Sequence, residues 1–126
     1  MTQPPFAPEQ FSSPTASSEN ELKKWLRSVA VGDRVEFIKC IWPINYILAL
    51  RLVRSSQIPI VEIESLLRHW LSLGQHNAAQ RLISSFEPLL GKERFWSVVS
   101  DVPLSESMRE FINYHSHGRL NENTHG

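Results

Sequence analysis

The chain has 126 residues, of which 41% are hydrophobic and 21% charged, and this is ordinary usage for one globular domain. Thirteen Lys and Arg balance thirteen Asp and Glu, and no segment has the basic stripe that a surface for duplex nucleic acid needs. Cys40 is the single cysteine, which excludes an intramolecular disulfide and a thiolate metal cage within the chain. A reducing compartment fits these features best, and we expect a cytoplasmic protein.

Residues 1–17 have the composition of a disordered N-terminal tail. They hold four of the eight prolines and a single charged residue, too little apolar surface to offset the entropy of ordering. They also lack the continuous apolar core of a secretory signal. Two interpretations stay open, because the segment is either an inert tail or a linear docking motif around Phe6 or Phe11.

Helical periodicity begins at Ser18, where apolar residues start to recur at intervals of three and four. Ser18 and Glu21 have the spacing of a capping box, which predicts a short amphipathic helix over 18–30. Gly32 then interrupts the pattern, and Asp33 is placed to cap the helix that follows.

The most apolar element spans residues 35–53, and its apolar side chains fall on more than one face of a helix. This predicts a central helix that is buried nearly all round. Its uncharged part runs only from residue 40 to residue 50, whereas a membrane span needs ~20 apolar residues, so no span is expected. Pro43 removes a helical amide and disfavours helical geometry at Trp42, so the helix is kinked or split there. The kink lets the helix wrap round its neighbours, or it forms a hinge or cleft at Trp42 and Pro43.

Two further helices are expected around a turn at Gly74. Pro59 suits a first helical position, Gly74 suits a left-handed cap, and a loop this short makes the next helix, which ends near Leu90, antiparallel. Two short helices then follow, and Ser105 caps the last. Since no run alternates as a strand does, the sequence predicts an all-α compact bundle of five or six helices over 18–118, with a frayed end at 119–126.

The block "ESLLRHWLSLGQHNAAQRLISSF", residues 64–86, resembles one tetratricopeptide helical hairpin. Trp70 stands at a packing position of the first helix and Gly74 lies in the turn. The small Ala79 and the large Phe86 follow in the order of the second helix. The resemblance implies a surface that binds a protein or a peptide. The alternative is a plain antiparallel hairpin, which also needs a small residue near its turn.

No familiar catalytic constellation is present in the sequence. The glycines are isolated, so no phosphate-binding loop is predicted, and the apolar surroundings of Cys40 favour a structural role over a nucleophilic one. His69 and His76 flank the Gly74 turn and are explained as surface and turn positions. A helix would point His115 and His117 to different sides, which disfavours a metal site. We therefore expect no catalytic, cofactor-binding or metal site.

The leading hypothesis is a small non-enzymatic helical module that binds another protein or a peptide, as an adaptor, assembly factor or regulatory subunit. A surplus of bulky apolar residues motivates it, and also makes a homodimer possible. The first alternative is a nucleic-acid-binding regulator with a helix-turn-helix around residues 59–87, which steep salt dependence would reveal. The second is an enzyme with an unrecognised site in the bundle. The candidate partner-binding residues are Trp42, His69, Trp70, His76, Gln80 and Arg81.

Overall fold

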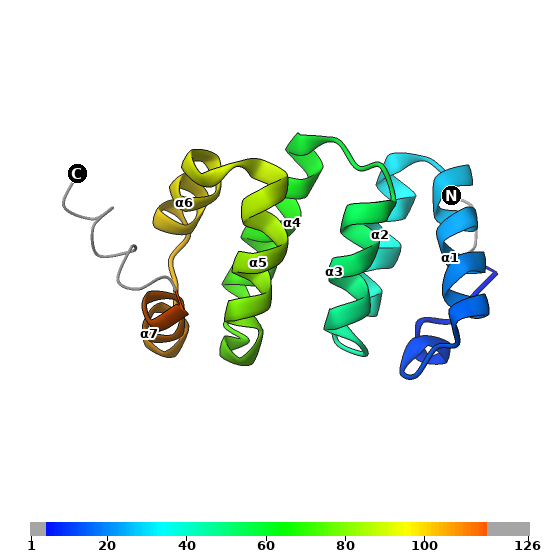
Figure 1. Ribbon diagram of the computed structural model, residues 1–126, viewed down its shortest axis with the longest axis horizontal. Helices are drawn as coiled ribbons and strands as arrows, with labels where there is room; N and C mark the ends of the chain where they lie inside the picture. Colours follow the sequence, from blue (N-terminus) through cyan, green and yellow to red (C-terminus); the bar gives the residue numbers. More distant parts are fainter. Residues whose placement is uncertain (1–4, 116–126) are drawn as a thin grey trace. The chain divides into compact units, whose positions relative to one another are not determined.

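Proline, glycine and capping residues divide the chain into short helices in its computed structural model, which describes residues 5–115 (Figure 1). Within this range every regular element is a helix, so the predicted all-α class is confirmed. The described residues 5–115 contain seven α-helices and two 3-10 helices, whereas five or six helices were expected, so the expected number is not confirmed. The elements are η1 (Pro8–Phe11), α1 (Ala16–Ser28), α2 (Val31–Ile41), α3 (Tyr46–Ser55), α4 (Ile60–Ser72), η2 (His76–Ala78), α5 (Ala79–Leu90), α6 (Lys92–Asp101) and α7 (Glu106–His115).

The helices form two compact units, Met1–Pro59 and Ile60–Gly126. The first, called unit 1, contains η1 and α1 to α3, and the second, unit 2, contains α4 to α7 and η2. The expected division into a tail, one domain over 18–118 and a frayed end stays a prediction, and residues 119–126 lie outside the described range. No helix within residues 5–115 combines the length and the apolar character that crossing a membrane requires.

Helix α1 begins earlier than its periodicity predicts. Thr15 is the N-cap, since its Oγ1 accepts a hydrogen bond from the Ser18 backbone N–H at 3.1 Å. The expected cap at Ser18 is therefore wrong by one turn. The apolar side of α1 buries Leu22 and Leu26 completely.

Pro43 splits the central helix in two. The backbone amides of Ile44 and Asn45 both donate to the carbonyl of Ile41, at 2.9 and 2.8 Å, which closes a turn after α2. Asn45 then caps α3, because its Oδ1 accepts from the Leu48 amide at 3.1 Å. Of the two outcomes expected at Pro43, a kinked helix or a split one, the structure has the split, because Asn45 offers a second cap two residues after the proline.

Burial along residues 35–53 is less complete than expected. Pro43 and Ile47 are exposed, and so is Cys40, which removes burial as the explanation for that cysteine. Asp33 also differs from its expected role, since it lies inside the first turn of α2 rather than at its cap. The positions in this segment that do form core are Val35, Phe37, Ile38, Ile41, Trp42, Leu48, Ala49, Leu50, Leu52 and Val53.

Arg34 links the C-terminal end of α1 to the C-terminal end of α3 within unit 1. Its guanidinium donates to the carbonyls of Arg27 at 3.2 Å and Val29 at 2.9 Å, at the end of α1, and of Ser56 at 3.0 Å, just after α3. Carbonyls at a helix C-terminus lack intrahelical partners, and a planar guanidinium with five donors can serve several of them together. Arg27 adds two bonds of its own to the carbonyl of Ser55.

In unit 2 the chain reverses at Gly74, which has the left-handed φ of 71° expected of it. Helices α4 and α5 then pack against each other, and α6 and α7 pack on α5 (Figure 1). The tetratricopeptide resemblance of this hairpin is not confirmed. The predicted cap of the last helix is confirmed, since Ser105 Oγ accepts from the Met108 amide at 3.2 Å.

Arg68 joins α4 to α6 through charge. Its guanidinium donates to Asp101 at 2.6 Å and to Glu64 at 3.3 Å, and Arg94 lies 3.8 Å from Glu64. The hydrogen bond that Arg68 donates to Asp101 is the main cause that raises the pKa of Arg68 above its ordinary value. Since these side chains are partly exposed, the network fixes the pairing of the two helices more than it stabilises them.

Candidate functional site

Two of the six sequence-predicted binding residues lie in the interior. The side chain of Trp42 is 2% exposed and its ring centroid lies 5.6 Å from that of Tyr46. Trp70 is 0% exposed and packs edge-on against Phe86, with centroids 5.8 Å apart. Neither indole reaches the surface, so a partner cannot touch either ring in this structure.

The other predicted binding residues belong to the α4–α5 hairpin. His69, Gln80 and Arg81 are exposed and could contact a partner. His76 begins η2, but its side chain lies outside the described part of the structure. The role of these four residues stays a prediction.

Unit 1 contains a feature that helical periodicity did not indicate, which we call the aromatic cluster: Phe6, Phe11, Trp25 and Phe37. Phe6 lies 5.7 Å from Phe11 and 6.1 Å from Trp25, measured between ring centroids. Phe37 completes the circuit at 6.4 Å from Phe11 and 5.2 Å from Trp25. All four pairs meet edge to face, the arrangement that the ring quadrupole favours.

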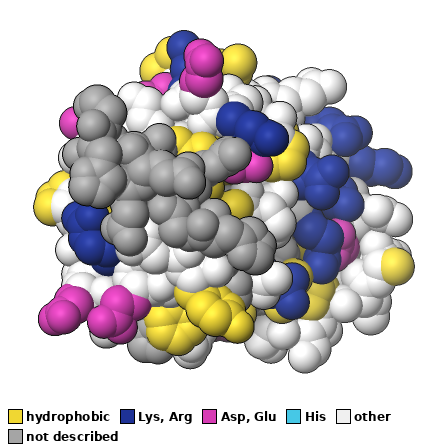
Figure 2. All heavy atoms as spheres, turned by 60° about the vertical axis from the view of Figure 1, so that its left-hand side comes forward, with side chains coloured by type: hydrophobic (Ala, Val, Ile, Leu, Met, Phe, Trp, Pro, Cys, Tyr) yellow, Lys and Arg dark blue, Asp and Glu magenta, His cyan; other side chains and the backbone are white. Residues whose placement is uncertain are grey.

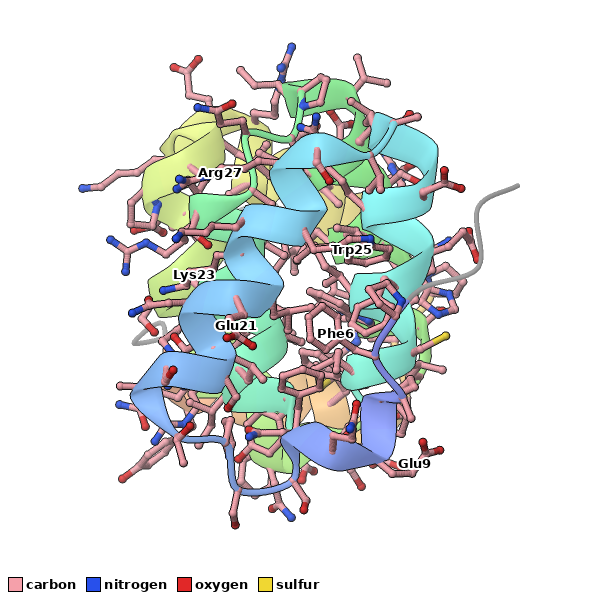
Figure 3. The ribbon with its side chains drawn as sticks, turned by 90° about the vertical axis from the view of Figure 1, so that its right-hand side faces the viewer. Phe6, Glu9, Glu21, Lys23, Trp25 and Arg27 are labelled. Atoms are coloured by element: carbon pink, nitrogen blue, oxygen red, sulfur yellow. The ribbon has the colours of Figure 1, made fainter. Side chains whose placement is uncertain are left out.

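The aromatic cluster is graded from interior to surface. Phe11 is 1% exposed and Phe37 5%, whereas Phe6 and Trp25 are only half-buried. Of the four Trp side chains, Trp25 alone is not buried. Figure 3 shows Phe6 and Trp25 close together between α1 and α2, facing the viewer. Part of the area of Phe6 and Trp25 therefore remains accessible, and two of the four rings, Phe6 and Phe11, come from outside the α-helices.

The segment that supplies Phe6 and Phe11, residues 5–11, is called the arm below. Its single turn is closed by two hydrogen bonds between Ala7 and Gln10, one from backbone to backbone and one from the Ala7 amide to the Gln10 side chain. Pro8 occupies the first position of this turn, where its missing amide costs nothing. In the structure this part of the expected flexible tail thus has a defined conformation on the surface of unit 1.

Asn45 attaches the arm to the rest of unit 1. Its Nδ2 donates to the carbonyl of Phe11 at 3.0 Å, while its Oδ1 accepts from Leu48 as the cap of α3. Sequence reasoning missed this residue. Its position after Pro43 and three residues before Leu48 is a capping signal, but nothing local indicates that the other side of the amide faces residue 11.

Helix α1 carries charge on its other side. Figure 3 shows Lys23 and Arg27 pointing away from Phe6 and Trp25. Glu19 lies on the charged side, with Arg51 at 2.8 Å and Lys23 at 3.1 Å. The hydrogen bond from Arg51 is the main cause that lowers the pKa of Glu19. The helix therefore separates an aromatic face from a charged one.

Apolar side chains also reach the surface elsewhere. Figure 2 shows hydrophobic side chains at several separate places, between groups of charged ones. Single exposed apolar residues are normal on soluble proteins, so these positions do not define a site by themselves. The large hydrophobic residues with the greatest exposure are Ile47, Ile60, Val61, Leu73, Phe111 and Tyr114.

The side chains described between residues 5 and 115 contain no group of His, Cys, Asp or Glu that could hold a metal ion. Over its described residues the protein is all-helical, and the two Phe rings of the arm complete the aromatic cluster with Trp25 and Phe37. Comparison with models of protein families, with curated proteins and with solved structures finds no match.

Proposed function

We propose that the protein is a non-enzymatic helical module that binds another protein, as an adaptor, assembly factor or regulatory subunit. The observation that carries the proposal is the arm, a short peptide segment held on unit 1 by two Phe rings and one side-chain hydrogen bond. A partner's peptide can use the same contacts. The aromatic cluster is the proposed centre of the binding surface.

Aromatic side chains that are partly exposed suit this role for a physical reason. Protein interfaces draw most of their energy from a few large residues, among which Trp is prominent, in a setting that excludes water. Trp25 is half-buried and already lies in edge contact with Phe6 and Phe37. Only part of its ring must lose water when a partner docks, and its orientation is already fixed.

The arm also indicates what kind of contact this surface favours. Peptide recognition combines side-chain anchors, which give specificity, with bonds to the peptide backbone, which give affinity with little dependence on sequence. Phe6 and Phe11 act as anchors, and Asn45 donates to a backbone carbonyl. This combination supports peptide binding better than binding of nucleic acid, which would need several unpaired cations near the site.

The proposal moves the centre of binding away from the α4–α5 hairpin. Trp42 and Trp70, the two large residues among the sequence candidates, are buried. His69, Gln80 and Arg81 of the hairpin are exposed, and their contact with a partner stays a separate prediction.

Affinity capture of the tagged full chain from its native cells, after nuclease treatment, tests the proposal. We expect a co-purifying protein in near-equal amount, lost with Trp25→Ala and retained with Gln80→Ala, each variant first shown to be folded by circular dichroism. The opposite order, loss with Gln80→Ala alone, would move the surface to the hairpin. Recovery of the chain without any partner would contradict the function itself.

A further inference from the structure

We infer that the partner presents a segment with the chemistry of the arm, a Phe-x-Pro-x-x-Phe turn, and that this segment replaces residues 5–11 on the aromatic cluster. The arm is then a tethered occupant that the partner must displace. This inference rests on the proposed function and adds the class of ligand and the competition that controls access to the site.

The chemistry of the ligand follows from the contacts of the arm. Phe11 enters the buried part of the cluster beside Phe37, while Phe6 covers the half-buried Trp25. The intervening turn, which begins at Pro8, brings the two Phe rings to 5.7 Å from each other. A segment without proline can form the same turn, but proline fixes φ and lowers the entropy lost on docking.

The receptor side of these contacts persists when the arm leaves. Trp25 belongs to α1 and Phe37 to α2, and they remain in contact with each other at 5.2 Å. The amide of Asn45 keeps its orientation, because its Oδ1 stays engaged as the cap of α3. A site whose groups are already oriented loses little freedom on binding, and this favours a replacement ligand.

Most of the arm is open to solvent, since residues 5–10 are exposed or half-buried and only Phe11 is buried. Its outer ring, Phe6, is only half-buried, and Glu9 and Gln10 are exposed. The connection to α1 passes through Ser12 and Ser13, which are both exposed. A short tether nevertheless gives the arm an effective concentration in the millimolar range, so that a free peptide of equal affinity competes poorly.

Because the arm and the partner compete for the same site, a substitution that weakens the contacts of the arm should strengthen binding of the partner segment. The apparent affinity of a ligand equals its intrinsic affinity multiplied by the fraction of protein whose site is open. Phe6→Ala removes a ring from the arm and leaves the receptor groups unchanged. It should therefore strengthen binding in trans, by about tenfold if the half-buried ring contributes what its area indicates.

The test measures fluorescence anisotropy of a labelled peptide with the sequence of residues 4–12, titrated with the full chain. We expect binding to Phe6→Ala to be about tenfold tighter than to the unsubstituted protein. Glu9→Ala, an exposed arm position, is the matched control and should behave like the unsubstituted protein. A peptide in which both Phe residues are Ala should not bind.

Equal binding to both proteins, or no binding to a Phe6→Ala chain with intact circular dichroism, would overturn the inference. If Phe6→Ala does not fold, Phe6→Leu decides, because it keeps apolar bulk and loses only the ring contacts; its binding must still exceed that of the unsubstituted chain. Loss of a captured partner with Trp25→Ala, without any peptide exchange, would refute this inference and leave the proposed function. Peptide exchange without a partner in cells would refute the function instead.

Discussion

The two units use aromatic residues in different ways. In unit 2, Trp70, Phe86, Phe95 and Trp96 are all buried, and the polar indole edge of Trp96 is satisfied by a 2.6 Å bond to Glu87. In unit 1 the aromatic cluster reaches the surface. Aromatic rings therefore form a closed core across α4, α5 and α6 of unit 2, although Phe111 and Tyr114 of α7 are exposed singly. In unit 1, part of a connected aromatic cluster reaches the surface and is covered by a short segment.

The difference arises from what surrounds the rings. Helices α4, α5 and α6 supply the buried rings of unit 2 and pack on one another, so the area of these rings is removed from water by helix packing. In unit 1 the outer side of Trp25 is covered by Phe6, from a segment that contains only a single 3-10 turn. Covers made of short segments open more readily than packed helices. Binding function is accordingly easier to place in unit 1.

The largest expected effect is that of Trp70→Ala. Removing a fully buried Trp leaves a cavity, and the expected loss is about 3–5 kcal/mol of unfolding free energy. Trp25→Ala should cost about 1–2 kcal/mol, because the side chain is only half-buried. Urea denaturation followed by circular dichroism measures both. Equal losses of unfolding free energy would contradict the distinction between the enclosed Trp70 and the half-buried Trp25.

Arg34→Lys should be the next most severe change. An ammonium cannot donate to carbonyls at the ends of both α1 and α3, so we expect a loss of about 2 kcal/mol, with carbonyls left unpaired. Arg54→Lys, at an exposed position of α3, is the matched control and should change stability by under about 0.5 kcal/mol. Thermal unfolding of the two variants side by side checks the contrast; indistinguishable midpoints would contradict it.

Phe6→Ala should have a smaller effect on global stability, about 1.4 kcal/mol or less, since the ring is half-buried and lies in the arm. Its local effect should be larger. Brief digestion with chymotrypsin should cut after Phe11 faster in the variant, because cleavage of a locally open segment follows its open population. An unchanged cleavage rate would mean that Phe6 does not hold the arm closed.

The smallest expected effect concerns pH. Because Arg51 lowers the pKa of Glu19, this carboxylate stabilises the fold above its unfolded pKa, about 4.3, and the contribution is lost as the pH falls through the lower folded value. Glu19→Gln should therefore cost up to about 1 kcal/mol at neutral pH and nothing near about pH 2. Glu21→Gln is the control. A cost that persists in acid would show that packing, and not charge, is lost.

Local signals predicted much of the fold. The helical class, the reversal at Gly74 and the cap at Ser105 depend on residues close in sequence, and these are features that periodicity and capping rules describe. Pro43 predicted where the helix is interrupted, but not whether it is kinked or split there. The choice between a kink and a split was made by Asn45, whose cap starts a new helix.

The candidate site was much less predictable, because it depends on contacts between distant residues. Composition alone predicts that a segment such as residues 5–11 stays free. It cannot include the side-chain amide of Asn45, 34 positions after Phe11, which donates a hydrogen bond to the Phe11 carbonyl. Periodicity also treats all four Trp alike. It places each on an apolar face, but it cannot tell that Trp25 lies at the edge of its unit while Trp70 is enclosed.

The central claim, that the arm covers Trp25, is tested most directly by nuclear Overhauser effects between aromatic protons in the full chain. With Phe and Trp rings labelled selectively, and Phe6→Leu used for assignment, the structure predicts cross-peaks from the Phe6 ring to Trp25. It also predicts cross-peaks from the Phe11 ring to Phe37. Absence of the Phe6 to Trp25 cross-peaks, together with sharp, random-coil resonances for residues 5–11, would contradict the account.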